Sequence, residues 1–329
     1  MPHAIKPLPF KPPYLIELSE RLLGSHYENN YGGAVRRLNA IEQRLDDLDW
    51  NAAGPFDING LKREELIAAN SMLLHEVYFD GLGGADGLGS PAGEAPGDLA
   101  GALARDFGGV EGWRAEFVAM GKALAGGSGW VVLAWSARQG RLVNQWGADH
   151  AHALADGVPI LALDMYEHAY HLDFGSDAAA YVDAFMKNIH WGRPADRFRQ
   201  ATGFAAGNST SEEQPASVSP EALREQLDRH GDLLVLDVRP ADFIFERHGT
   251  IPGASVRPPE RLAEWADELP RDRPIVAYCV YGFQVSGDAV AELRRRGLDA
   301  RILSGGIAAW NAIGAPTRPL DALVRKAAP

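Results

Sequence analysis

Two residues that can bind a metal ion stand at the end of an apolar run in the middle of the chain. Residues 160–163 read as a buried strand, Asp164 follows them directly, and His168 comes four residues later. A carboxylate at the end of a buried strand is costly unless another group offsets its charge. The aspartate and the histidine can therefore form an ion pair, or both can be ligands of one metal ion.

Two further histidines occupy apolar settings on separate expected helices. His26 lies on the apolar face of a helical pattern over residues 17–48, and His75 lies beside the apolar stripe of a second pattern over residues 62–79. Each can be a core histidine with satisfied hydrogen bonds. Taken with the pair at the strand end, however, three imidazoles and one carboxylate suit iron, manganese or zinc, and their spacing matches no structural zinc motif.

The elements that would position these side chains follow from the periodicity of the first 205 residues. The two helices together would form a long antiparallel hairpin. Further helices are expected at 99–107, 110–124, 178–189 and 191–200, and strands at 130–135, 141–146 and 160–163. The predicted class is α+β, with helices around a three-stranded antiparallel sheet.

The pattern changes after a segment of small and polar residues at 206–217, which is typical of a linker. Helices are expected beyond it at 219–229, 259–268 and 286–296, alternating with strands at 233–236, 274–278 and 300–303. This alternation predicts an α/β domain with a parallel sheet. We therefore expect a metal domain over 1–205, the linker, and a second domain over 218–329.

Composition narrows the class of function. The net charge of −12 argues against nucleic acid or an anionic membrane as a partner, and no apolar run is long enough to span a bilayer. The first residues lack the apolar core of a signal peptide. A single cysteine, Cys279, excludes an intrachain disulfide and fits a reducing compartment. The expected location is cytoplasmic.

Cys279 is also a candidate nucleophile. It follows an expected strand and precedes an expected helix, so it would face free backbone N–H groups and the positive end of a helix dipole. Both favour the thiolate, which is the reactive form. The alternative is a buried and inert thiol.

Residues 1–205 resemble the iron/manganese superoxide dismutases along their whole length. The resemblance implies one iron or manganese ion per chain, held by His26, His75, Asp164 and His168, and the dismutation of superoxide to dioxygen and hydrogen peroxide. The matching pieces are His26-Tyr27, Leu38-Asn39, Tyr78-Phe79, Phe107-Gly108, Glu116-Phe117, Gly127-Ser128-Gly129-Trp130, Asp164-Met165-Tyr166-Glu167-His168-Ala169-Tyr170 and Trp191-Gly192-Arg193-Pro194-Ala195-Asp196-Arg197-Phe198.

The resemblance also implies roles around the metal. The family places a glutamine near the metal-bound solvent, either from the second helix, where this chain has Ser71, or from the β-hairpin, where it has His150. His150 is therefore the candidate for that role, and it favours iron; a histidine on a surface turn is the alternative. The aromatic side chains of Trp130 and Tyr166 would line the metal site.

Further implied residues lie in the last motif. Tyr170 belongs to that motif, and Glu167 would reach His168 of the partner subunit in a homodimer formed by the first domain. The motif usually ends in a second tyrosine, which is His171 here.

Three more positions depart from the family at the entrance to the metal. Two histidines and a tyrosine usually guard the substrate funnel and help to deliver protons; Asn30, Tyr31 and Ala34 stand in their places. The metal ligands are thus kept while the gate is rebuilt. Because superoxide is an anion and the chain is acidic, local cations would have to focus the field at the funnel. The candidates are Arg36, Arg37 and Arg193.

Residues 218–320 resemble a rhodanese domain. The resemblance implies that Cys279 accepts a sulfane sulfur as a persulfide and passes it to a thiophilic acceptor, while Asp237 and Arg239 hold the fold. No arginine or lysine lies between Cys279 and Ser286, so donor and acceptor stay open. The matching pieces are Leu236-Asp237-Val238-Arg239, Ile251-Pro252-Gly253-Ala254, Tyr278-Cys279, Gly282 and Leu303-Ser304-Gly305-Gly306-Ile307-Ala308-Ala309-Trp310.

These observations together favour a two-domain enzyme that combines a metal-dependent superoxide dismutase with a sulfurtransferase or thiol redox domain. Two alternatives stay open. The first domain can be a metal-binding scaffold for dimerisation or sensing, with chemistry confined to Cys279. The chain can also bind an oxyanion such as chromate, because the loop Cys-Val-Tyr-Gly beside a dismutase-like domain resembles proteins of bacterial chromate-resistance clusters.

Overall fold

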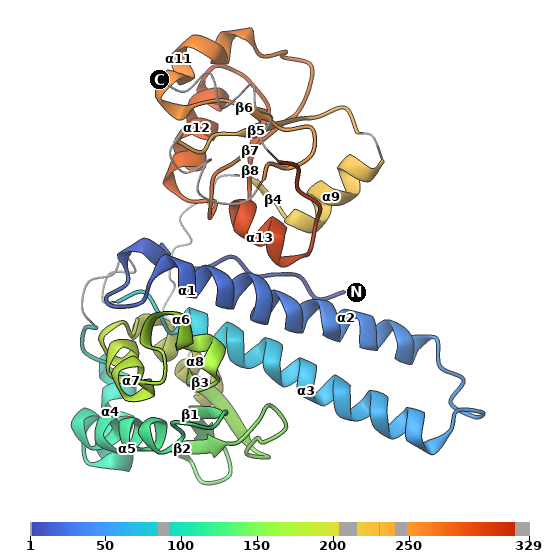
Figure 1. The fold of residues 1–329 in the computed structure, drawn as a ribbon. Helices are drawn as coiled ribbons and strands as arrows, with labels where there is room; N and C mark the ends of the chain where they lie inside the picture. The colour runs from blue at the N-terminus through green and yellow to red at the C-terminus, as the bar shows by residue number, and fades with distance from the viewer. Residues whose placement is uncertain (1, 85–91, 204–215, 230, 241–248, 320–329) are drawn as a thin grey trace. The chain divides into compact units, whose positions relative to one another are not determined.

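The computed structural model describes residues 2–84, 92–203, 216–229, 231–240 and 249–319 (Figure 1). The chain divides into two compact units, which include residues 8–203 and residues 216–319 respectively. Most of the expected linker, residues 206–215, lies outside the described residues. Each unit has its own sheet and its own buried core, so each is described by itself.

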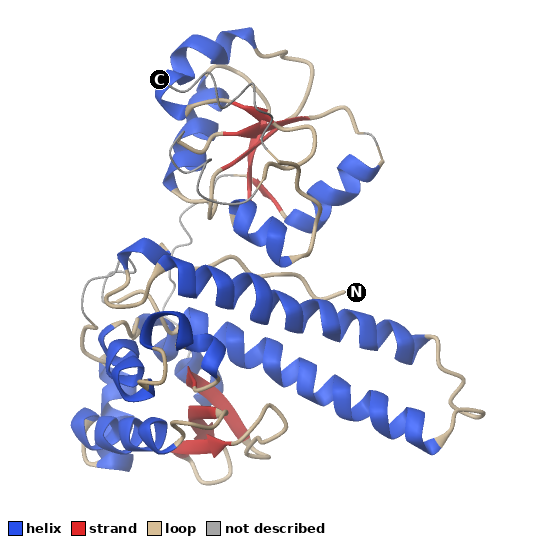
Figure 2. Ribbon diagram, in the orientation of Figure 1, coloured by secondary structure: helices blue, strands red, loops and turns tan. Residues whose placement is uncertain are grey.

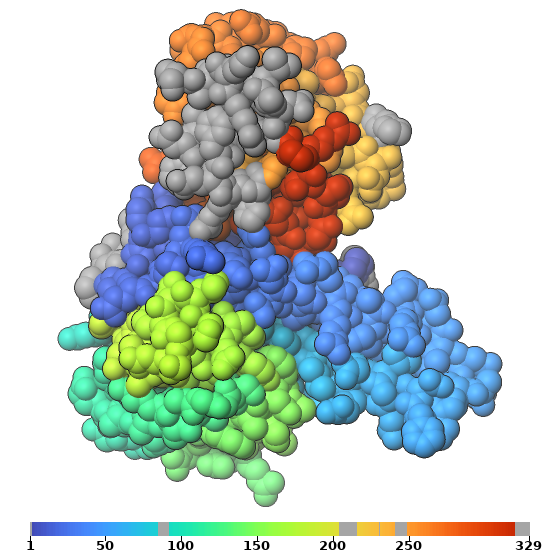
Figure 3. All heavy atoms as spheres, in the orientation of Figure 1, coloured from blue at the N-terminus to red at the C-terminus, as the bar shows by residue number. Residues whose placement is uncertain are grey.

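The first unit begins with a short 3-10 turn and a long helical hairpin. Its helical segments are η1 (Pro12–Tyr14), α1 (Glu20–Ser25), the π-helical segment η2 (His26–Tyr31), α2 (Gly32–Asp46) and α3 (Pro55–Asp80). The hairpin of α2 and α3 was expected. In Figure 3 the far ends of these two helices project as a blue arm beyond the rest of the unit.

The start of the first helix differs from the expectation. Glu17 has a φ of 61°, which a right-handed helix does not allow, and Ser19 caps the helix by accepting a hydrogen bond from the N–H of Leu22. The helix then widens into the π-helical segment at His26. A π-helical turn re-aims the side chains that it carries, and such turns are frequent at functional sites.

The second helix starts earlier than its apolar stripe suggested. Pro55 stands at its first turn, where the missing N–H costs nothing, and Gly54 precedes it. Residues 55–60 are mostly exposed, with Phe56 exposed over 92 % of its surface. Because this first turn and a half packs against little, it leaves no apolar periodicity in the sequence.

The rest of the first unit confirms the predicted α+β class. Trp130 pairs with Asp164, so the start of the central strand lies beside the end of its neighbour, and the antiparallel order is β2-β1-β3 (Figure 2). The elements are α4 (Gly97–Phe107), α5 (Val110–Ala123), β1 (Trp130–Ser136), β2 (Arg141–Gly147), β3 (Gly157–Asp164), η3 (Glu167–Ala169), α6 (His171–Phe174), α7 (Ala178–Lys187) and α8 (Gly192–Thr202).

The second unit is a parallel five-stranded sheet covered on both faces, as predicted. The strand order is β4-β8-β7-β5-β6. One buried cluster contains side chains of α11 and α12, and another contains side chains of α9 and α13, so the helices cover opposite faces. The elements are β4 (Ser217–Val218), α9 (Pro220–Asp228), β5 (Leu234–Asp237), β6 (Ser255–Val256), η4 (Pro259–Arg261), α11 (Leu262–Trp265), η5 (Ala266–Glu268), β7 (Ile275–Tyr278), α12 (Gln284–Arg295), β8 (Ala300–Leu303) and α13 (Gly306–Ala312).

Some expectations for this unit need correction. The single helix expected at 259–268 is three short pieces, two of them 3-10 turns. The sheet also has two short edge strands, β4 and β6, of two residues each. So short a strand shows no alternation of polar and apolar residues and can be recognised only by its pairing. Among the residues described, no helix combines the length and apolar character needed to cross a membrane.

We predict that one glycine of the first unit cannot carry a side chain. Gly129 has a φ of 141°, and a Cβ there would lie 2.1 Å from the carbonyl oxygen of Gly147. Gly129→Ala should therefore lower the free energy of unfolding by about 3 kcal/mol or more, because the obstacle is backbone. Denaturant unfolding followed by circular dichroism measures the change.

Gly126→Ala is the matched control. Gly126 has a φ of 80°, but a Cβ there meets nothing within 4 Å. We expect a loss of about 1 kcal/mol from the backbone conformation alone. Equal losses in the two variants would contradict the prediction.

Candidate metal centre and candidate thiol site

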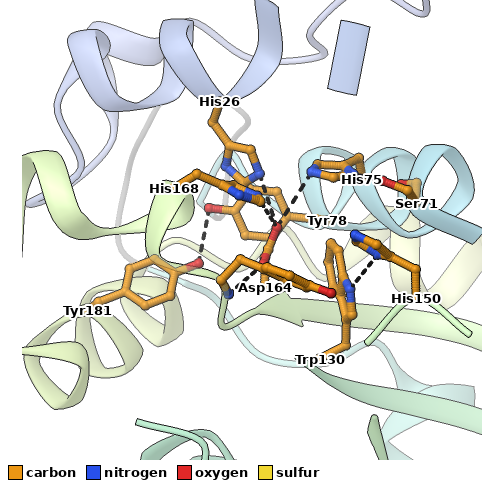
Figure 4. A network of polar contacts seen from close by, with 10 residues as sticks. His26, Ser71, His75, Tyr78, Trp130, His150, Asp164, His168 and Tyr181 are labelled. Atoms are coloured by element: carbon orange, nitrogen blue, oxygen red, sulfur yellow. Dashed lines mark hydrogen bonds and ion pairs between the residues drawn. The ribbon is translucent and has the colours of Figure 1, made fainter. Parts of the chain in front are cut away.

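Four candidate metal ligands from four separate elements meet at one point of the first unit (Figure 4). His26 opens the π-helical segment, His75 lies on α3, Asp164 ends β3, and His168 lies in the turn η3. Each offers one ligand atom, and these four atoms all lie within 4.8 Å of one another. The structure thus brings together all four residues that the sequence singled out, while their role as ligands stays a prediction.

The three imidazoles converge on a single carboxylate oxygen. The Oδ2 of Asp164 lies 3.1 Å from the Nε2 of His26, 3.2 Å from that of His168 and 3.6 Å from that of His75. Metal bonds to nitrogen and oxygen of about 2.1 Å would place two ligand atoms about 3.0 Å apart at a right angle and about 3.6 Å apart at 120°. The spacing around Asp164 therefore fits one ion bound by all four side chains.

The protonation of His75 is also suited to metal binding. Its Nδ1 donates to the backbone carbonyl of Ser71 at 2.6 Å, which leaves a lone pair on Nε2. Among the described residues, this buried Nε2 has no hydrogen-bond partner. A buried nitrogen without a partner is costly, and a metal ion in the site would satisfy it.

Burial and neighbouring charges set the protonation of these side chains so that they can bind a cation. Burial lowers the pKa of His75 to about 3 and also lowers that of His26, so both rings are neutral at pH 7. Burial alone would raise the pKa of Asp164, but His168 and His26 hold it well below its ordinary value. The result is a buried carboxylate beside the neutral imidazoles of His26 and His75, which suits a divalent or trivalent ion.

The carboxylate of Asp164 is held in place by the backbone. Its Oδ1 accepts a hydrogen bond from the N–H of Tyr166 at 2.9 Å, which turns Oδ2 toward the imidazoles. Three of the four side chains are almost fully buried, whereas the side chain of His168 is 26 % exposed. His168 therefore marks the side of the site that lies nearest to solvent.

His150 lies beside the four ligands and is fixed in one tautomer. The indole Nε1 of Trp130 donates to its Nδ1 at 3.0 Å, so Nε2 carries the proton of the neutral ring. The side-chain amide of Asn70 donates to its backbone carbonyl at 2.6 Å, and its ring stacks on Tyr166 with centroids 4.8 Å apart. The ring is 6.2 Å from that of His75. His150 is thus a rigid N–H donor next to the site.

Aromatic side chains form the rest of the wall. The hydroxyl of Tyr181 donates to that of Tyr78 at 3.3 Å, and the ring of Tyr78 lies 4.9 Å from that of His26. Burial raises the pKa of both tyrosines, so both are neutral. Tyr170 stacks on Tyr181 with centroids 5.4 Å apart. Sequence reasoning did not find the Tyr78–Tyr181 pair, because 103 residues separate its members.

The positions of the rebuilt gate differ in their surroundings. Tyr31 is buried, its hydroxyl donates to Glu76 at 3.2 Å, and its ring lies 6.4 Å from that of His75. Ala34 is buried and His171 is exposed. Tyr31 therefore places a tyrosine beside the candidate metal ligands. It stands one helical turn before Ala34, the position where a tyrosine was expected.

The cations expected to guide superoxide are partly engaged elsewhere. Arg193 donates to the backbone carbonyls of Leu82 at 3.0 Å and of Pro9 at 2.9 Å, and it is half-buried. Arg37 forms an ion pair with Glu64. Both contacts tie elements of the first unit together.

Cys279 occupies the expected place in the second unit. It follows β7, an inner strand of the parallel sheet, and precedes α12. The thiol is 6 % exposed, and its Sγ lies 3.2 Å from the hydroxyl of the fully buried Ser286. The carbonyl of Cys279 accepts from the N–H of Ile307, which fixes the loop to the start of α13.

Asp237 and Arg239 hold the neighbouring strand end. The guanidinium of Arg239 donates to both carboxylate oxygens of Asp237, and the hydroxyl of Tyr278 donates to Asp237 at 2.8 Å. Asp237, Arg239 and Tyr278 are almost fully buried. Such a network stabilises the sheet edge that carries Cys279.

Comparison with known proteins identifies relatives of the first unit. Residues 95–197 match the family model described as iron/manganese superoxide dismutases, C-terminal domain. The chain is 64 % identical over 201 residues to a superoxide dismutase [Fe] of Cupriavidus metallidurans, covering 61 % of this chain and 98 % of that protein. It is 33 % identical over 203 residues to superoxide dismutase [Mn] 1 of Halobacterium salinarum, covering 60 % of this chain and 96 % of that protein.

A third relative and a second family model complete the comparison. A superoxide dismutase [Fe] of Aquifex aeolicus is 33 % identical over 206 residues, covering 60 % of this chain and 93 % of that protein. Residues 219–313 match the model of the rhodanese-like domain. The two matches fall on the two units, so the chain joins two modules with separate relatives.

We predict that the metal-free protein loses stability in acid through its buried histidines. His75 has a pKa of about 3 when folded and an ordinary value of 6.5 when unfolded, so between these values the unfolded chain binds the extra proton. The free energy of unfolding should therefore fall by up to about 1.4 kcal/mol per pH unit for each such histidine as the pH drops below about 6.5. Denaturant unfolding between about pH 7 and about pH 5 measures this slope.

Two variants test the origin of the slope. His75→Gln should flatten it, whereas His152→Gln should not, because the side chain of His152 is 54 % exposed and pairs with Asp149 at the surface. An unchanged slope in His75→Gln would show that this histidine is not responsible.

Proposed function

Because the chain belongs to the iron/manganese superoxide dismutase family, we propose that His26, His75, Asp164 and His168 bind the metal at which its first unit disproportionates superoxide. The observation that carries the proposal is the convergence of three Nε2 atoms on the Oδ2 of Asp164. The unpartnered Nε2 of His75 supports it, because nothing else among the described residues satisfies that nitrogen.

A bound iron or manganese ion would supply one-electron chemistry, by which one superoxide is oxidised to dioxygen and the next is reduced to hydrogen peroxide. The residues of the chain supply position and protons. The carboxylate of Asp164 offsets the positive charge of the ion, and the buried imidazoles exclude water from it. Reduction to peroxide consumes two protons, and the Nε2–H of the neutral His150 can donate a hydrogen bond that orients a water molecule carrying such a proton.

Three narrower assignments belong to the same proposal. Iron is preferred over manganese, on the ground of His150 at the hairpin position and of the iron-dependent relative that is 64 % identical. A homodimer through the first unit would bring Glu167 of the partner subunit to the exposed edge of His168. The single cysteine supports a reducing, cytoplasmic location.

We predict that loss of one ligand removes metal and activity together. His75→Gln and Asp164→Asn should each lower the rate of superoxide decay by about 100-fold or more. Even the residues that hydrogen-bond to metal ligands commonly contribute 10- to 100-fold to metal affinity or activity. Metal content by mass spectrometry and the rate of superoxide decay are measured on protein purified without added metal. His3→Gln is the control, since His3 pairs with Glu42 away from the site.

His150→Ala separates metal binding from proton delivery. The variant should keep its metal, while its rate of superoxide decay falls by about 10- to 100-fold, because the hydrogen bond that orients the proton-carrying water is lost. If the metal-loaded protein removes superoxide no faster than the free ion does, the first unit is a binding scaffold and the proposed dismutation is wrong.

We further propose that the second unit transfers sulfur at Cys279. The observation that favours it is the place of the cysteine, at the end of an inner strand and before α12, with the hydroxyl of Ser286 at 3.2 Å from Sγ. A hydroxyl at this distance can donate to a thiolate, and the helix start favours its negative charge. Both features stabilise the nucleophilic form.

We predict that Cys279→Ser abolishes sulfur transfer and leaves superoxide decay unchanged. The thiol is the only one in the chain, so no other cysteine can take its place. Thiocyanate formed from a sulfur donor and cyanide measures the transfer. Equal rates for the variant and the unaltered chain would exclude Cys279 as the nucleophile.

A further inference from the structure

The loop that follows Cys279 carries no positive charge. Residues 280–287 contain no lysine, arginine or histidine, and the first charged side chain after the cysteine is Asp288, in the second turn of α12. Asp288 is exposed and negative. The groups nearest to the thiol along the chain are therefore neutral or acidic.

The group that contacts the thiol is also neutral. The hydroxyl of Ser286 is fully buried and lies 3.2 Å from the Sγ of Cys279 and 3.2 Å from the carbonyl oxygen of Phe283. It has one hydrogen to donate, either to a sulfur anion or to that carbonyl. One hydroxyl can hold a single negative charge on sulfur, but it cannot offset the second charge of a dianion.

A surface hollow along α12 is acidic. Its volume is about 530 Å³, and its lining includes Val285, which precedes Ser286 in the chain. Three acidic residues also line it: Glu260, Asp288 and Glu292. Its guanidinium, Arg296, already donates to Glu292 at 2.7 Å and to Asp267 at 2.9 Å. The field of these carboxylates opposes the approach of an anion and favours a neutral or zwitterionic molecule.

From this charge pattern we propose that Cys279 takes its sulfur from an organic persulfide, R–S–SH, rather than from the thiosulfate dianion. The inference rests on the sulfur-transfer function proposed above and names the donor class of that site. The reacting form, R–S–SH, places no charge on the sulfur that is transferred, and its conjugate anion carries a single charge, which one hydroxyl can hold. Thiosulfate carries two charges, and its leaving group, sulfite, keeps them in a site that offers no compensating cation from residues 280–287.

The step is balanced without a further reactant. The thiolate of Cys279 attacks the outer sulfur of R–S–SH, a new S–S bond forms at Cys279, and the S–S bond of the donor breaks. The proton stays on the transferred sulfur, and the donor leaves as the thiolate R–S⁻. No net oxidation occurs, because one persulfide replaces another. Cyanide can then take the outer sulfur as thiocyanate and regenerate the thiol.

The test compares two donors on the full chain. Thiosulfate and cysteine persulfide, generated in the assay, are each supplied with cyanide as acceptor, and the rate of Cys279→Ser is subtracted from both. We expect kcat/KM for cysteine persulfide to exceed that for thiosulfate by about tenfold or more. An equal or higher value for thiosulfate would overturn the proposal and leave the sulfur-transfer function standing.

A pair of variants tests whether charge is the cause. Gln284 is exposed at the start of α12. Gln284→Arg should raise kcat/KM for thiosulfate about tenfold, because one added cation near a dianion contributes that much, while cysteine persulfide changes little. Gln284→Met, of similar length and without charge, should change neither. Equal effects of the two variants on thiosulfate would contradict the role of charge.

Mass spectrometry distinguishes failure of the donor assignment from failure of the function. Each donor is added without acceptor, and the mass of the intact chain is measured. The proposal expects one added sulfur atom with cysteine persulfide, and none in Cys279→Ser. If neither donor adds sulfur to Cys279, both the proposed sulfur-transfer function and the proposed donor class are wrong.

Discussion

The first unit depends on how the charge of one buried carboxylate is offset. Asp164 lies at the end of an apolar strand, fully buried, with three imidazole nitrogens around a single oxygen. Neutral rings leave most of its charge uncompensated, and protonated rings would themselves be buried charges. A metal ion in the site would resolve the conflict, because it would bind the carboxylate and the lone pairs of the imidazoles together.

Each surrounding element contributes to this arrangement by a local feature. The π-helical segment begins at His26, the i−4 carbonyl of Ser71 orients His75, and the N–H of Tyr166 turns the carboxylate. Trp130 belongs to both the sheet and the site, because it pairs with Asp164 across the strands and fixes the tautomer of His150. The fold thus sets the orientation of the ligands and of their neighbours at once.

The two units place their reactive side chains in the same way but handle charge differently. Asp164 follows the last apolar residues of β3, and Cys279 follows the last apolar residues of β7. At such a position the backbone is about to leave the sheet but is still held by the hydrogen bonds of the strand. The first site gathers groups that bind a cation. The second places the proposed nucleophile, Cys279, in a loop without cationic side chains, beside a hydroxyl and a helix start. One chain would therefore combine, under the proposed functions, electron transfer at a metal with atom transfer at a thiol.

The residues at the entrance to the candidate metal site differ from those usual in the family, and they line the way by which a substrate would reach it. Ala34 removes a tyrosine that the family usually carries, yet Tyr31 packs near His75 from the preceding turn. Its hydroxyl donates to Glu76, so it is held by α3, the helix that carries His75. Because the metal ligands and the gate are set by different side chains of the same helices, the gate can change while the ligand geometry is kept.

The sequence by itself determined the composition of both sites and the class of both folds. Apolar periodicity located the two hairpin helices and the inner strands, and residue type marked His26, His75, Asp164 and His168 as candidate ligands. These features depend on burial and on local backbone preference, which a short window of sequence contains. The resemblance to known families added the expected roles.

Only the tertiary structure decided the distances and partners. Convergence on one oxygen of Asp164, the tautomer of His150, the Tyr78–Tyr181 pair and the contact of Ser286 with Cys279 all join residues from different elements or from opposite ends of a loop. Such contacts depend on how elements pack, on the register of a sheet and on the direction of a turn. Local sequence does not contain that information, because a chain's short-range preferences leave the relative placement of its elements open.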